Sequence, residues 1–421
     1  MSMKDSFLWV TVLLLLLMGS VSGGVPIPSK SSQGNAIHYV VVEQADKQMP
    51  RADTATVAEI APGHLYLVYH RYRPNPKGGS DFGRASIWAR ESKDDGRTWG
   101  AAREIIPDRK EDFSVLMPAV CRLRDGELLL LANRIHGESS TTMELHRSND
   151  DGRTWRFDRA IWTRSKGQWL QGGAAQLLRL SDGRLILPVH GGTGSQGKQK
   201  NDAWCYLSDD KGKTWRRSKG TIKLPMRGAM EASIAEMSDG ELVLSLRTQL
   251  GGPFITRSAD GGETWSPAQP SGLVGPESCT CLRRIPGTDL LVLFWNSSTY
   301  LANHHHYGER TPLSVATSRD GGRSWRKTGD IETEKGVGYF NLNCTFTSSG
   351  RAIVTYAVAK PAWQNRAISL KCAVIPKAWF IVEEDAANGR LSQDANWHIH
   401  DTLMSGNLKS SKRPSNSAVT K

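Results

Sequence analysis

Short β-rich runs of four to seven residues recur in pairs along the chain, and a glycine turn separates the two members of each pair. The six pairs cover residues 55–60 and 65–69, 119–123 and 128–131, 174–180 and 185–189, 232–237 and 242–246, 279–285 and 290–294, and 342–347 and 352–356. Runs of this length on either side of a glycine turn are typical of β-hairpins. The pattern therefore predicts six hairpins and an all-β chain.

An octamer of the form Ser-x-Asp-x-Gly-x-Thr/Ser-Trp follows five of the six hairpins. Its copies begin at Ser92, Ser148, Ser208, Ser258 and Ser318, at intervals of 50 to 60 residues. The aspartate of such a turn accepts backbone N–H groups, the glycine supplies a positive φ, and the tryptophan buries apolar area between sheets. Since the aspartate recurs in nearly every unit, we expect it to build the fold rather than to catalyse a reaction. Together the repeats predict a six-bladed β-propeller with Asp-box repeats.

The ends of the chain complete this picture. Residues 37–43 form an isolated strand, which is expected to join the sixth blade and so close the ring. Residues 1–24 have the charged, apolar and small-residue regions of a signal peptide, which predicts a secreted or periplasmic protein. Residues 25–382 are expected to form the propeller, and residues 383–421 a C-terminal appendage with a disordered tail.

The composition limits the classes of binding partner that we expect. The net charge of +12 favours anionic ligands such as acidic glycans, although part of it lies in the C-terminal tail. Nucleic acid is not expected as a partner of an exported protein, and no segment after the signal peptide is long and apolar enough for stable membrane insertion. The three consecutive histidines at 304–306 lack metal-ligand spacing, so neither a metal nor a cofactor is expected.

The rim of the central channel can be located by counting from the hairpin glycines. Nine residues before them stand Thr54, Met117, Ala174, Glu231, Ser278 and Asn341, and seven residues after them stand His70, Asn133, His190, Arg247, Phe294 and Ala357. Close neighbours of these positions are Arg51, Asp53, Gln171 and Glu277. Polar residues at the ends of apolar strands indicate either a ligand pocket on a rigid scaffold or a water-filled axial channel.

The octamers and the segment 230–247 resemble the sialidase (neuraminidase) superfamily over nearly all of the chain after residue 24. In that family three arginines hold the substrate carboxylate, an aspartate is the acid/base, and a glutamate activates a tyrosine nucleophile. The resemblance implies that Glu231 is the activating glutamate and that Arg247 and Arg310 belong to the arginine triad. It also implies that Asp81, in the loop before the third strand of blade one, is the acid/base.

Two positions depart from the family pattern. Asp53, rather than Arg51, stands where the first arginine of the triad is expected. Asn341 stands at the nucleophile position, and Tyr339 lies two residues earlier, where regular strand alternation would place it on the same face. A sialidase mechanism would thus need Tyr339 as a substitute, whereas another glycosidase mechanism needs only two carboxylates.

Two functions follow from these residues. The first is a secreted, sialidase-like glycoside hydrolase that acts on an acidic or polar glycan and has Asp81, Glu231 and Tyr339 as catalytic residues. Its substrate-binding residues would be Arg51, Asp53, His70, Gln171, His190, Arg247, Glu277, Arg310 and Asn341. The alternative is a non-catalytic glycan-binding propeller, in which the carboxylates only pair with the arginines.

Overall fold

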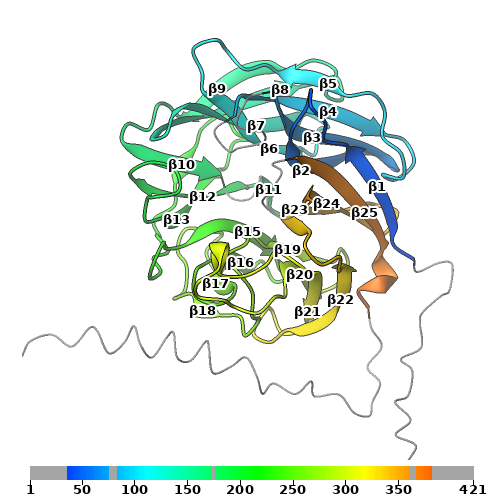
Figure 1. Ribbon diagram of the computed structural model, residues 1–421. Helices are drawn as coiled ribbons and strands as arrows, with labels where there is room; N and C mark the ends of the chain where they lie inside the picture. The colour runs from blue at the N-terminus through cyan, green and yellow to red at the C-terminus, as the bar shows by residue number, and fades with distance from the viewer. Residues whose placement is uncertain (1–35, 75–82, 173–175, 361–366, 382–421) are drawn as a thin grey trace, which may run out of the picture.

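The structure is a computed structural model that describes residues 36–74, 83–172, 176–360 and 367–381. Six antiparallel sheets surround a central axis as the blades of a propeller, which confirms the predicted fold class (Figure 1). The predicted signal peptide, the C-terminal appendage and Asp81 lie outside the described residues. Within the described part of the chain, no helix has the length and apolar character needed to cross a membrane.

Each blade has an inner strand beside the axis, followed outward by three more strands. Blade one consists of β2 (Ala52–Ala61), β3 (His64–Tyr72), β4 (Ala85–Ser92) and β5 (Arg103–Ile106). Blade two consists of β6 (Ser114–Arg122), β7 (Leu128–Gly137), β8 (Ser140–Ser148) and β9 (Arg156–Trp162). Blade three consists of β10 (Gln168–Gly172) and β11 (Leu178–Arg179), which both pair with β12 (Leu185–Thr193), and of β13 (Asp202–Ser208) and β14 (Arg216–Arg217).

The second half of the chain repeats this plan. Blade four consists of β15 (Met230–Glu236), β16 (Leu242–Arg247), β17 (Phe254–Ser258) and β18 (Gln269–Pro270). Blade five consists of β19 (Cys281–Arg284), β20 (Leu291–Asn296), β21 (Leu313–Ser318) and β22 (Arg326–Glu332). Blade six consists of β23 (Gly338–Phe346), β24 (Arg351–Ala359), β25 (Ile368–Pro376) and the N-terminal β1 (His38–Glu43).

Strand β1 closes the ring as expected. It pairs antiparallel with β25, with Val40 opposite Cys372. Glu43 at its end accepts hydrogen bonds from Arg90 Nη2 at 2.8 Å and from the Tyr69 hydroxyl at 2.5 Å, both of which belong to blade one. The N-terminal strand therefore fastens the last blade to the first.

The Asp boxes are turns between the third and fourth strands. In the second box the Asp150 carboxylate accepts the backbone N–H of Thr154 at 2.9 Å and its hydroxyl at 2.6 Å, while Gly152 has φ +81°. The first box donates a backbone hydrogen bond from Asp95 to Gly63 O, so it lies on the face that carries the hairpin glycines. The box aspartates are therefore structural and far from the opposite rim.

The core lies between the blades. Each box tryptophan packs in an apolar cluster that joins its own blade to the preceding one, as Trp155 does beside Tyr66 and Leu128. The indole N–H of Trp155 donates to the Tyr66 hydroxyl at 3.1 Å across this boundary. The repeated tryptophan thus locks neighbouring sheets together and accounts for part of the tryptophan content.

The inner strands are irregular where they reach the rim. Thr54, Met117, Glu231 and Asn341 all have φ between +37° and +56°, and the pairing register of their strands shifts there. These are the positions found by counting nine residues back from the hairpin glycines. A β-bulge re-aims side chains at such a point. In blade three the inner position is shared by β10, which precedes the expected run 174–180, and by β11 within that run, and in blade five β19 begins only at Cys281.

Candidate functional site

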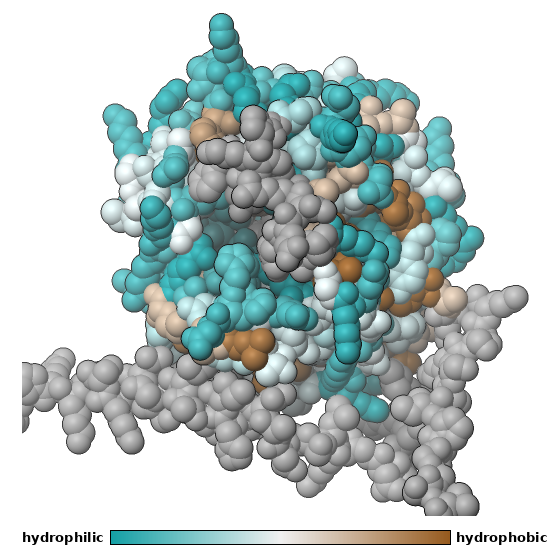
Figure 2. Space-filling view, in the orientation of Figure 1, coloured by the Kyte–Doolittle hydropathy of each residue, from teal (hydrophilic) through white to brown (hydrophobic). Residues whose placement is uncertain are grey.

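A cavity of about 900 Å³ lies at the rim, where all six blades contribute lining residues. Of the residues expected from the sequence, the cavity brings together Glu231, predicted as catalytic, and seven predicted as substrate-binding: Arg51, Gln171, His190, Arg247, Glu277, Arg310 and Asn341. Asp53 and His70 are buried behind its wall, and Tyr339 is buried elsewhere. The surface on this side of the molecule is mainly hydrophilic, with small scattered apolar areas (Figure 2).

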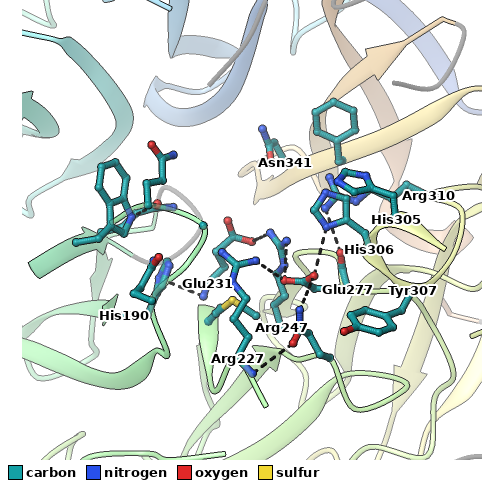
Figure 3. A pocket seen from close by; sticks show the side chains of 18 of the residues that line it. His190, Arg227, Glu231, Arg247, Glu277, His305, His306, Tyr307, Arg310 and Asn341 are labelled. Carbon is teal, nitrogen blue, oxygen red and sulfur yellow. Dashed lines mark hydrogen bonds and ion pairs between the residues drawn. The ribbon is translucent and has the colours of Figure 1, made fainter. Parts of the chain in front are cut away.

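Arg247 connects two glutamates at the centre of the site (Figure 3). Its Nη1 donates to Glu231 Oε2 at 2.7 Å, and its Nη2 donates to Glu277 Oε1 at 3.2 Å. Burial alone would raise the pKa of Glu231, but the adjacent charge of Arg247 outweighs this effect, so that the net shift is downward. Burial is likewise outweighed at Glu277, whose pKa lies well below its usual range because of Arg247. Both carboxylates are therefore ionised near neutral pH.

The Glu277 carboxylate is buried and hydrogen-bonded to several neighbouring side chains. Its carboxylate accepts hydrogen bonds from Arg227 Nη1 at 2.7 Å and from Gln249 Nε2 at 3.1 Å, and His306 Nδ1 lies 3.3 Å from it. Only 3 % of the Glu277 side chain is exposed. Glu277 thus holds Arg227 and Arg247 in place.

Arg310 supplies a further cation from blade five. Its Nη2 donates to the backbone O of Glu277 at 3.0 Å, and its guanidinium lies 5.3 Å from the centre of the Phe340 ring. Burial and the nearby charge of Arg247 lower the pKa of Arg310 to about 10. Two buried guanidinium groups that repel each other form a site that an anion would stabilise.

Asp53 lies beside the cavity, covered by two of its lining residues. Arg51 Nε donates to Asp53 Oδ2 at 2.8 Å, and Asn341 Nδ2 donates to the same oxygen at 3.0 Å. His70 also pairs with Asp53 through Nε2. Because the backbone N–H of Met117 donates to His70 Nδ1 at 3.2 Å, the ring proton lies on Nε2 and points to Asp53. Asp53 therefore orients Arg51 and Asn341 and does not itself line the cavity.

In blade three, His190 accepts a backbone hydrogen bond at Nδ1 in the same way as His70. The backbone N–H of Glu231 donates to its Nδ1 at 3.2 Å, as that of Met117 does to His70. Burial lowers the pKa of His190 to about 4, so the ring is neutral and can accept this bond. His190 thus supports the left-handed backbone that carries the Glu231 side chain into the cavity.

Tyr339 does not share a face with Asn341, which corrects the expectation that it replaces the nucleophile. The bulge between Phe340 and Asn343 breaks the alternation of β23, so Tyr339 turns into the apolar cluster between blades five and six. There its side chain is 1 % exposed, and burial together with Glu332 raises its pKa. A buried phenol with a raised pKa is a poor nucleophile.

Several lining residues were missed in the sequence. Arg227 and Gln249 lie in loops beside β15 and β16 rather than at counted strand ends, although their place next to Glu231 and Arg247 was a usable signal. The three consecutive histidines at 304–306, which the sequence did single out, also line the cavity, together with Tyr307. Among the residues that the structure describes, no group of three or more His, Cys, Asp or Glu side chains is arranged to hold a metal ion.

Arginine side chains outnumber carboxylates in the lining of the cavity. Arg51, Arg227, Arg247 and Arg310 face two carboxylates, Glu231 and Glu277. The planar guanidinium group suits bidentate binding of a carboxylate. Trp169, Tyr307 and Phe340 add apolar surface to the same cavity. The arrangement can bind an anionic ligand that also has an apolar face.

The chain is similar to known proteins both in sequence and in structure. A sialidase of Bacteroides fragilis is 27% identical over 205 residues, which are 46% of this chain and 35% of that protein. A sialidase of Paraclostridium sordellii is 26% identical over 219 residues, 46% of this chain and 52% of that protein. The chain thus spans between about a third and a half of the length of these relatives.

The structural similarity concerns the fold. The solved structure of the Hadza microbial sialidase Hz136 superimposes with a TM-score of 0.64 at 21% identity, covering 82% of this chain and 69% of that one. Residues 63–349 match the family model of the BNR repeat-like domain, which is more than half of the chain. On its repeats, its six blades and this match, the chain belongs to the BNR repeat-like family within the sialidase superfamily.

Proposed function

We propose that the protein is a glycoside hydrolase of the sialidase type that acts on a glycan with an acidic sugar. The observation that carries this proposal is the excess of arginines over carboxylates in the lining of one cavity. Arg247 and Arg310 would hold the acidic group, and Arg51 and Arg227 would strengthen the positive potential around it. The similarity to sialidases over part of the chain supports the same class of substrate.

The proposed chemistry uses water in place of a tyrosine. Glu231, held ionised by Arg247, would accept a proton from a water molecule whose oxygen attacks the anomeric carbon. The glycosidic bond then breaks, and a general acid protonates the leaving oxygen. Asp81 is proposed for this step on the sequence resemblance alone. Attack by water inverts the anomeric carbon, and Asn341 leaves room for it where a tyrosine would form a covalent intermediate.

A second candidate is a glycan-binding protein without turnover. Asn341 donates to Asp53, and Tyr339 is buried in the core, so β23 provides no nucleophilic side chain to the cavity. Glu231 would then serve only to balance Arg247. We further propose that the protein is exported, on the strength of residues 1–24.

The test has two measurements. Hydrolysis of a fluorogenic sialoside by the purified protein reports turnover, and calorimetry reports the binding of free sialic acid. The variants are Glu231→Gln, which keeps the shape of the side chain, and Arg257→Lys as a control on blade four outside the cavity. A hydrolase shows turnover that falls by a factor of roughly 100 or more in Glu231→Gln. Binding without turnover by the wild-type protein would favour the second candidate. If the wild-type protein shows neither binding nor turnover, sialic acid is rejected as its ligand.

A further inference from the structure

A second hollow, of about 490 Å³, lies on blade three. Its lining consists of Gln168, Leu170, Gly191, Gly192, Thr193, Lys200, Asp202, Trp204, Tyr206 and Arg217, which we call the blade-three groove. Strands β10 and β12 separate it from the main cavity. Alternate residues of a strand face opposite sides, so Gln171 and His190 line the main cavity while Leu170 and Gly191 line the groove.

Two glycines, Gly191 and Gly192, form part of the groove lining. A Cβ atom on Gly191 would collide with the backbone O of Trp169 and approach Leu170 Cδ2 to 2.7 Å, and one on Gly192 would collide with the backbone O of Lys200. Only glycine therefore allows the backbone of neighbouring segments to approach this closely at positions 191 and 192. The His-Gly-Gly segment at 190–192 thus lines the main cavity with its histidine and the groove with its glycines.

Aromatic side chains form the outer wall of the groove. Asp202, Trp204 and Tyr206 alternate along β13 and so share one face. The guanidinium of Arg217 lies 4.1 Å from the centre of the Trp204 ring, and Tyr206 stacks on Trp162 at 5.5 Å. These contacts hold the wall in place before any ligand binds.

Trp204 carries a polar atom that lacks a partner. The side chain is 6 % exposed, and its Nε1 is buried without a hydrogen-bond acceptor among the residues that the structure describes. A buried N–H without an acceptor costs free energy that a ligand oxygen would recover. Trp204 is part of the groove lining, together with Asp202, Lys200 and Arg217.

Donors, an acceptor and apolar ring surface in one hollow match the chemistry of a sugar. A pyranose ring has hydroxyl groups that both donate and accept, and a C–H face that packs against apolar surface. Within the lining, the carboxylate of Asp202 offsets one of the two cations, Lys200 and Arg217, so the groove has a smaller excess of positive charge than the main cavity with its four arginines and two glutamates. We propose that the blade-three groove is a second carbohydrate site, which binds a neutral hexose residue of a glycan.

The two sites would bind different parts of a glycan. The main cavity has four arginines, whereas the groove has Lys200 and Arg217 with Asp202 among them. The acidic sugar would therefore enter the cavity and a neutral sugar the groove. The groove proposal does not depend on turnover, because it concerns binding on the other side of β10 and β12.

The test uses lactose as the probe and the full chain as the protein. Titration followed by tryptophan fluorescence and by saturation-transfer NMR is expected to give a saturable Kd of about 1 mM, a typical weak sugar affinity. Arg217→Ala and Trp204→Phe should each weaken lactose binding by roughly tenfold, because one loses a donor and the other the indole N–H. Arg216→Ala is the matched control, since the neighbouring Arg216 pairs with Glu263 outside the groove and should leave the Kd unchanged.

Glu231→Gln separates this proposal from the proposed function. Lactose affinity retained in Glu231→Gln, with sialoside turnover lost, would support a site distinct from the cavity. Three results would overturn the proposal. They are no saturable lactose binding by the folded wild-type protein, an unchanged Kd in Arg217→Ala and Trp204→Phe, or lactose binding abolished by Glu231→Gln.

Discussion

At the scale of single residues, the site is defined by largely buried charges whose partners lie both within a blade and across a blade boundary. Arg247 on blade four pairs with Glu277 of blade five, and Arg310 of blade five binds the backbone of the same glutamate. A buried charge is costly unless it is paired and hydrogen-bonded. The arginines are therefore held in fixed positions, which reduces the entropy that a ligand must remove on binding.

Arg310→Lys tests the importance of the guanidinium plane. Lysine keeps the charge but cannot donate a planar fork to a carboxylate or stack on Phe340 as Arg310 does. We expect the affinity for free sialic acid to fall by a factor of about 10 to 100, with a folded protein. Calorimetric titration provides the measurement, and Arg257→Lys the control. Equal affinity of Arg310→Lys and wild type would contradict the assigned role.

His190 predicts a pH dependence of stability. Burial lowers its pKa from about 6.5 to about 4 in the folded protein, so the unfolded chain binds a proton at this residue while the folded one does not. Stability should therefore decrease as the pH falls from about 6.5 to 4, by at most on the order of 3 kcal/mol from this group.

His190→Asn isolates this contribution. Asparagine retains an acceptor for the Glu231 N–H but does not titrate. The free energy of unfolding in urea, measured from pH 7 to pH 4, should decrease less in the variant than in the wild type. Parallel curves for the two proteins would show that His190 is not the titrating group.

At the scale of elements, two local motifs have separate tasks. The Asp boxes shape the turns on one face of the propeller, and the bulges aim side chains at the rim on the other face. The positive φ values of Glu231 and Asn341 have a cost of about 1 kcal/mol or more for residues other than glycine. Such strain at equivalent positions of several blades indicates that the bulge presents side chains to the channel.

Asp150→Ala distinguishes the two tasks. The variant removes two hydrogen bonds to Thr154, so we expect a loss of about 1 to 2 kcal/mol in the free energy of unfolding. Ligand binding in the cavity should not change, because the box lies on the face of the hairpin glycines. Arg153→Ala in the same turn is the control for stability. A change in sialic acid affinity without a change in stability would argue against a purely structural aspartate.

At the scale of the whole molecule, stability depends on closure of the ring. Apolar clusters join each blade to the next, and the cluster between blades six and one includes Val42 of β1 with Leu67 and Tyr69. Without β1, strand β25 would have an open edge. The cavity also depends on closure, because Arg51 comes from blade one and Asn341 from blade six.

Glu43→Ala tests the closure without truncating the chain. The variant leaves Arg90 and the Tyr69 hydroxyl without their shared carboxylate, and loss of one partner of a largely buried ion pair costs on the order of 3 kcal/mol. Differential scanning calorimetry should show a lower Tm, and hydrogen exchange should be faster in β25. Gln44→Ala, at the adjacent exposed position, should have little effect. An equal decrease in both variants would show that Glu43 has no special part in closure.

Local sequence determined the repeat architecture. Hairpin turns and Asp boxes are short, so their chemistry can be read within eight to ten residues, and counting from the hairpin glycines located the positions of Glu231 and Asn341. The closing strand at 37–43 was also predictable, because it was an unpaired strand and the sixth blade lacked one.

Only the tertiary structure decided which side chains enter the cavity. The bulge in β23 turned Tyr339 into the core, Arg51 and Asn341 covered Asp53, and Arg227 reached Glu277 from a loop. The direction of each of these side chains depends on backbone irregularities and on partners up to 288 residues away in the chain. Alternation along a regular strand cannot predict them, since a bulge changes the face and contacts between blades decide which orientation is stable.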